Sequence, residues 1–167
     1  MRNLSILKTL ASILFVLCMI GIFFGIPCIL MIIFLPASIP FKINGEPAGA
    51  AGVETIILLF AVAAGFSFFT YALYLFKKVL ELFEKKKIFH DDVIKNLNQT
   101  GKAIIIGYFI IAVAYTFHQL FVGKSIEIST NDITETLLTL GLGLFFMVLS
   151  EVFLIAKGLK EENDLTV

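Results

Sequence analysis

The sequence predicts an all-α integral membrane protein, a four-helix antiparallel transmembrane bundle that forms a single domain over residues 1–167. Composition gives the first indication, because 59% of the 167 residues are hydrophobic, only 16% are charged and the mean hydropathy is +0.98. A water-soluble domain carries about a quarter charged residues. The apolar excess is therefore too large to be buried in one soluble core, which places the chain in a bilayer.

Four long apolar runs supply the second indication. A helix needs about 20 residues to cross the roughly 30 Å of hydrocarbon in a bilayer. Each of the four runs reaches that length, and Glu151 is the single formal charge that interrupts the last one. We therefore predict spans at about 9–35, 54–76, 102–122 and 134–156, a hairpin at 77–101 between the second and third spans, and a tail at 157–167.

The distribution of positive charge predicts the orientation. Eleven of the 13 Lys and Arg residues lie in the N-terminal segment, the connection after the second span and the C-terminal tail, whereas the other two connections hold only Lys42 and Lys124. Lys and Arg gather on the cytoplasmic side of membrane proteins. Both termini and the 77–101 connection are therefore expected in the cytoplasm.

The 77–101 connection has the pattern of a helical hairpin that extends the second and third spans beyond the bilayer. Val79 and Phe83 continue the apolar face of the second span, and Val93 and Leu97 recur at helical spacing before the third. Between them, Asp91 is placed to cap the third helix. The hairpin is expected to stand about 15 Å out of the membrane.

Glu151 is the most costly polar group within the predicted spans, since a carboxylate at the bilayer centre costs about 2.5 to 3.5 kcal/mol. It lies six residues before Lys157, while Tyr71 and Tyr108 each lie six residues from a lysine that flanks their own span. This spacing predicts a shared depth, with Glu151 accepting a hydrogen bond from Tyr71 or Tyr108. The alternative is that Glu151 reaches water or pairs with Lys78 or Lys102.

Several function classes are excluded or disfavoured by what the sequence lacks. Its formal net charge is zero, so we expect no direct binding of nucleic acid. It contains no phosphate-binding glycine loop, no H-E-x-x-H and no nucleophile elbow, so we expect no enzymatic activity, no catalytic residue and no cofactor. Polar residues near the outer ends of the spans lack the spacing of metal ligands and are interpreted as solvated, with no metal site: Glu54, His118, Gln119, Asp132 and Glu135.

Two segments resemble a family of small bacterial four-helix membrane proteins classed as a domain of unknown function. They are E-K-K-K-I-F-H-D-D-V-I-K-N-L at 84–97, with its K-I-F turn, and E-V-F at 151–153 followed by G-L-K-E-E-N-D-L-T-V at 158–167. Lys86 stands where family members often have Gly, and Lys102 where a Trp often follows the preceding Gly. The resemblance implies a bacterial inner (cytoplasmic) membrane location and a neighbouring gene for a small helix-turn-helix regulator, but no established chemistry.

The tail and the hairpin are the predicted interaction surface. We expect the tail to fold back so that its apolar residues dock on the hairpin and its acids face the hairpin lysines; a tail without fixed structure is the alternative. The hairpin lysines have two other interpretations: a cytoplasmic loop of a membrane protein is normally rich in lysine, and lysines bind anionic lipid headgroups. The candidate residues are Lys85, Lys86, Lys87, Phe89, Asp91, Glu161, Asp164, Leu165 and Val167.

These observations favour a non-enzymatic inner-membrane protein that acts as an interaction or regulatory module through its cytoplasmic hairpin and tail. Its expected partners are the lipid bilayer and a small cytoplasmic helix-turn-helix regulator, and a homo-oligomer is left open. The alternative is a proton-linked or small-solute transport component that uses the polar layer of Glu151, Tyr71 and Tyr108.

Overall fold

The structure is a computed structural model that describes residues 2–35, 42–43, 46–47, 52–122 and 130–165. Its described part contains four helices, α1 (Arg2–Phe34), α2 (Val53–Glu84), α3 (Asp91–Phe121) and α4 (Thr130–Leu165). Two-residue strands, β1 (Lys42–Ile43) and β2 (Glu46–Pro47), pair antiparallel between α1 and α2. All four helices are long and apolar enough to cross a membrane, as in a multi-pass membrane protein.

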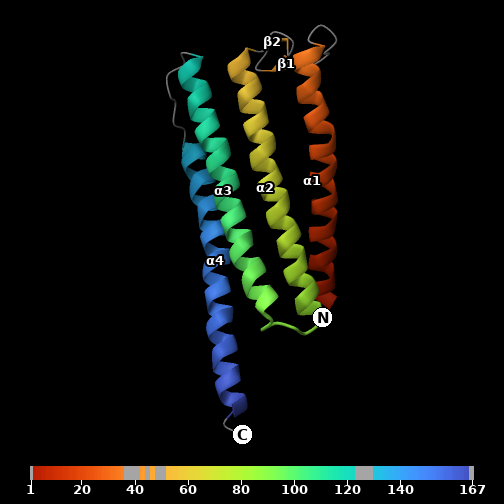
Figure 1. The fold of residues 1–167 in the computed structure, drawn as a ribbon, viewed down its shortest axis with the longest axis vertical. Coiled ribbons are helices and arrows are strands. Elements are labelled where there is room, and N and C mark those ends of the chain that lie inside the picture. Colours follow the sequence, from red (N-terminus) through yellow and green to blue (C-terminus); the bar gives the residue numbers. More distant parts are fainter. Residues whose placement is uncertain (1, 36–41, 44–45, 48–51, 123–129, 166–167) are drawn as a thin grey trace.

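The helices run alternately up and down, so the start of α1, the α2–α3 connection and the end of α4 lie at one end of the molecule (Figure 1). We call this the hairpin end. Each helix packs mainly against its neighbours in sequence. The rings of Phe76 and Phe146 also meet, with centroids 5.4 Å apart, which brings α4 against α2 as well as α3. Helices α2, α3 and α4 therefore form a three-helix unit, and α1 packs on the α2 side of it.

Two pairs of glycines lie where neighbouring helices pack closely. A Cβ atom at Gly65 of α2 would lie 2.8 Å from the carbonyl oxygen of Gly107 on α3. A Cβ at Gly101 of α3 would lie 2.4 Å from the carbonyl oxygen of Gly143 on α4. Small residues let helix backbones approach closely inside a membrane, where apolar side chains gain nothing by leaving lipid for protein. These two pairs fix the registers α2–α3 and α3–α4.

The most completely buried apolar side chains of the described residues lie at the hairpin end. Val79, Val93 and Leu97 form a buried cluster there, and none is more than 1% exposed. Toward the opposite end, Leu137 is 67% exposed and Phe121 is 77% exposed. An apolar surface of this extent is what lipid tails cover in a membrane protein.

Candidate interaction site at the hairpin end

The turn after α2 has a well-defined backbone. Lys86 adopts φ 59°, a left-handed conformation, and its N–H donates to the carbonyl oxygen of Phe83 at 3.0 Å. The N–H of Lys87 donates to the carbonyl oxygen of Leu82 at 2.9 Å. These two bonds form a Schellman motif, which usually has glycine at the left-handed position. A lysine in this left-handed conformation is strained.

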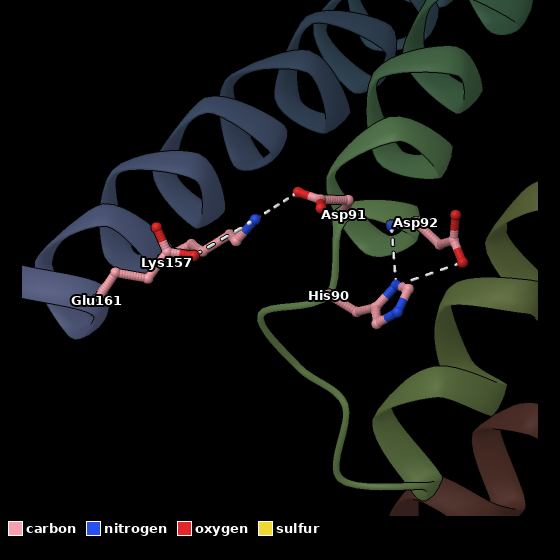
Figure 2. A network of polar contacts seen from close by, with 5 residues as sticks. All are labelled: His90, Asp91, Asp92, Lys157 and Glu161. Atoms are coloured by element: carbon pink, nitrogen blue, oxygen red, sulfur yellow. Dashed lines mark hydrogen bonds and ion pairs between the residues drawn. The ribbon is translucent and has the colours of Figure 1, made fainter. Parts of the chain in front are cut away.

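The next helix is capped by His90 rather than by Asp91, which corrects the predicted cap. His90 has an extended backbone, and its Nδ1 accepts the N–H of Asp92 at 3.2 Å (Figure 2). The same Nδ1 lies 3.3 Å from Oδ2 of Asp92. Asp91 is already the first helical residue, so its side chain is free of the capping role and points to α4.

An ion pair joins the hairpin to α4. Nζ of Lys157 donates to Oδ1 of Asp91 at 2.6 Å, and it lies 3.5 Å from Oε1 of Glu161 (Figure 2). Both partners lie outside the predicted spans. The hydrogen bond from Lys157 lowers the pKa of Asp91, and the same bond raises the pKa of Lys157. The pair is exposed, so it fixes position more than it adds stability.

Aromatic rings and buried side chains provide the larger contact between the hairpin and α4. The ring of Phe153 lies 5.6 Å from that of Phe83 and 6.3 Å from that of Phe89, measured between centroids. Phe153 also packs against the buried cluster of Val79, Val93 and Leu97. Nζ of Lys160 lies 5.8 Å from the centroid of the Phe89 ring. The hairpin and α4 thus form one packed unit.

The prediction that the tail folds back on the hairpin is wrong. α4 continues without a break to Leu165, which is 86% exposed, and Val167 lies outside the described residues. The hairpin is covered instead by Phe153 and Lys157, and the acid–base pairing is reversed, because the acid comes from the hairpin. Strong helix formers such as Lys160, Glu161 and Glu162 explain why the chain remains helical.

The predicted polar layer is not assembled, because the register separates its members. Tyr108 is hydrogen-bonded to Thr136 of α4 through the two hydroxyls. Glu151 is exposed and lies fifteen residues further along α4, about 22 Å from that level. The Gly65–Gly107 contact places Tyr71 between these two levels. Tyr71 is itself 47% exposed.

The predicted layer is wrong because the lysines that flank the spans do not all lie at one depth. Lys157 contacts Asp91, whereas Lys102 lies eleven residues further along α3, about 16 Å away. Another contact that the sequence analysis missed follows from the true register: the Ser150 hydroxyl, 1% exposed, donates to the carbonyl oxygen of Ile94 at 2.8 Å. The spacing of Phe146, Ser150 and Phe153 on one face of α4 was the available signal.

The polar residues at the opposite end are arranged for contact between helices. Oγ1 of Thr55 lies 3.2 Å from Nε2 of His118, which links the start of α2 to the end of α3. Within the described ranges, no group of three or more His, Cys, Asp and Glu side chains is placed to hold a metal ion. His118 is therefore part of a helix–helix contact.

Charge is divided unevenly over the hairpin end. The turn carries the exposed lysines Lys85, Lys86 and Lys87. α4 extends beyond the turn (Figure 1), and we call its residues 158–165 the α4 tip. The tip exposes three acids, Glu161, Glu162 and Asp164, and the last turn of α4 contains no basic residue. The hairpin end thus has a basic turn and, beyond it, the α4 tip with its three acids.

The profile described as DUF2975, a protein of unknown function, matches residues 34–167. The chain belongs to the DUF2975 family. The DUF2975 match includes α2, α3 and α4, the three-helix unit of the fold, together with the hairpin and the acidic end. Neither the curated proteins nor the solved structures contain a match to the chain.

Proposed function

We propose that this protein is a non-enzymatic membrane anchor whose α4 tip binds a small basic protein in the cytoplasm. The observation that supports this proposal is the charge of the tip. Three acids lie at the end of a helix where the backbone dipole is also negative. Lys160 is the one basic residue of the tip and Lys157 lies beside Glu161, so the acids outnumber the bases and the last turn contains no basic residue. Each such acid destabilises the helix end by about 0.3 to 1 kcal/mol.

A cationic partner would relieve that repulsion and so gain affinity from it. The tip also carries Leu159 and Leu165, which are 63% and 86% exposed and offer apolar contact beside the acids. Hot spots of protein interfaces combine apolar contact with a polar rim. The hairpin core and the Asp91–Lys157 pair hold the base of the tip in place, which reduces the entropy lost on binding.

The helix-turn-helix regulator that the family resemblance implies has the matching chemistry. A protein that binds DNA needs a Lys- and Arg-rich surface to contact phosphates. The acidic tip would occupy that surface, so membrane binding and DNA binding would compete. The protein would thereby hold a regulator at the bacterial inner membrane until it is released.

This role requires the hairpin end to face the cytoplasm, as the lysine distribution predicts. Transport through a polar layer is not proposed, because Glu151, Tyr71 and Tyr108 lie at different levels. An accessibility assay on cysteine variants at the tip and at residue 54, in intact cells, tests the orientation. Labelling of the tip by an impermeant reagent added outside would contradict the proposal.

The binding experiment uses the full chain with an N-terminal tag, purified from native membranes at low salt. We compare the wild type with the triple variant Glu161→Gln, Glu162→Gln and Asp164→Asn, and with the control variant Glu54→Gln and Glu135→Gln at the opposite end. A helix-turn-helix protein should co-purify with the wild type and the control, and be lost from the triple variant.

The captured regulator must then show the expected chemistry. Its binding should weaken steeply as salt is raised, and duplex DNA should displace it. Equal recovery with the tip variant and the control, or a complex that DNA does not affect, would refute the proposed role.

A further inference from the structure

A polar cleft opens between α2 and α3 at the hairpin end, separate from the α4 tip. Its volume is about 520 Å³. On α3 it is lined by Asp92, Lys95 and Gln99, whereas Ile94 and Gly101 face α4. At 100° per residue, these two groups lie on opposite sides of α3. The cleft is therefore on the face of the α2–α3 pair that is turned away from α4.

Three lysines, Lys78, Lys85 and Lys95, line this cleft, against two acids, Glu81 and Asp92. Lys78 lies over the ring of Tyr74, with Nζ 4.6 Å from its centroid. Lys85 and Lys95 form no ion pair with any residue that the structure describes. Asp92 is engaged with the His90 cap. The cleft thus has cationic groups that lack a protein partner.

The cleft also changes character along the membrane normal. Tyr71 and Tyr74 lie in the last turns of the predicted span 54–76, at the depth where tyrosine side chains collect at membrane interfaces. Lys78 and Lys85 lie about 3 Å and 14 Å beyond Phe76 along α2. The cleft therefore has aromatic rings at the hydrocarbon boundary and ammonium groups in the headgroup layer. A phospholipid has the matching order, with acyl chains on the hydrocarbon side and a phosphate on the headgroup side.

We propose that this cleft is a binding site for one anionic phospholipid, whose phosphate contacts Lys78, Lys85 and Lys95. Amides of Asn96 and Gln99 also line the cleft and hydrogen-bond to the glycerol and ester oxygens of the lipid. The acyl chains pass over Tyr71 and Tyr74. Basic pockets between helices on the cytoplasmic side of a membrane recognise such headgroups.

The test measures lipid retained by the full-length protein. Purified protein is exchanged into nanodiscs of phosphatidylcholine with a small fraction of phosphatidylglycerol, and bound lipid is counted by native mass spectrometry. The variant Lys78→Gln with Lys95→Gln is compared with Lys86→Gln with Lys87→Gln, which removes the same charge outside the cleft. Two lysines near an anionic surface are together worth about thirtyfold in affinity, so the cleft variant should lose phosphatidylglycerol by about that factor.

Two further measurements make the result decisive. The variant Asn96→Leu with Gln99→Leu leaves the charge unchanged and should also lower retention, and circular dichroism of each variant shows that the helices remain. Inorganic phosphate at millimolar concentration should not displace the lipid. Equal loss in the two lysine variants, equal retention of phosphatidylcholine, unchanged retention in the amide variant or displacement by phosphate would each overturn the proposal.

Discussion

The hairpin end and the opposite end of the molecule are held together in different ways. At the hairpin end, Val79, Val93 and Leu97 are buried among α2, α3 and α4, and Phe153 covers them. Further along the same helices, contact is made through glycine pairs and through single polar bonds such as that between Tyr108 and Thr136. A smaller buried cluster of Ala72, Ala103 and Ile104 lies there as well, and many apolar side chains beyond it, such as Phe121 and Leu137, are exposed.

The difference follows from the solvent that each end faces. Water drives apolar side chains together, so burial stabilises the part of the hairpin that leaves the membrane. Lipid tails give no such drive, so close backbone packing and hydrogen bonds take over within the bilayer. One pair of helices, α2 and α3, therefore changes its mode of association along its length.

Removing a buried side chain at the hairpin end should have the largest effect. Leu97→Ala should lower the free energy of unfolding by about 2 to 5 kcal/mol, because Leu97 is 1% exposed and its loss leaves a cavity. Leu137→Ala, at an exposed site on α4, should change it by no more than about 0.5 kcal/mol. Equilibrium unfolding in mixed micelles measures both, and equal losses would contradict the comparison.

A methyl group at a glycine contact should have the next largest effect. Gly101→Ala places a Cβ 2.4 Å from the carbonyl oxygen of Gly143, so the helices must separate at a cost of about 1 to 3 kcal/mol. Gly141→Ala is the control, since no atom lies within 4 Å of its added Cβ, and helix propensity should raise stability by up to about 1 kcal/mol. A loss in both variants would show that helix separation is not the cause.

Relieving the strained turn should raise stability by a smaller amount. Lys86→Gly removes the cost of a left-handed side-chain residue and should gain about 0.5 to 1 kcal/mol in the same unfolding assay. Lys87→Gly, whose backbone has no positive φ, should give no gain. A gain in the second variant equal to the first would point to lost charge repulsion instead of relieved strain.

The smallest expected effect concerns pH and the Asp91–Lys157 pair. The lowered pKa of Asp91 means that its contribution is fully present above 3.8 and is lost as pH falls through the lowered value. The raised pKa of Lys157 means that its contribution is present below 10.5 and is lost as pH rises through the raised value. Hydrogen-exchange protection where α3 begins should therefore stay constant between about pH 5 and 9.

The variant Asp91→Asn tests whether Asp91 causes the loss of hydrogen-exchange protection at low pH. It should reduce protection slightly at neutral pH and remove most of the decline at low pH, whereas Asp132→Asn at the opposite end should leave that decline in place. An unchanged decline in the Asp91 variant would assign it to other carboxylates.

The sequence was sufficient for features that depend on long patterns. Apolar runs predicted the four helices, and the positions of Val79, Val93 and Leu97 at helical spacing predicted a packed hairpin. These features are local, or repeat along one helix, so one sequence contains them.

Register was beyond the sequence, because it depends on which residues of two helices meet. The Gly101–Gly143 contact shifts α4 toward the hairpin end and carries Glu151 away from Tyr71 and Tyr108. The tail was mispredicted for a related reason. Leu165 was predicted to dock on the hairpin, but Phe153 already packs against the apolar side chains there.

The continuity of α4 has a mechanical consequence. Thirty-six residues from Thr130 to Leu165 form one helix, about 54 Å long, without a break at the membrane boundary. A force applied at the exposed end of α4 would be transmitted along this one helix, past its close contact with Gly101 of α3, to Thr130 at the opposite end of the molecule. Binding at the exposed end would therefore act directly on the packing of α4 against α3.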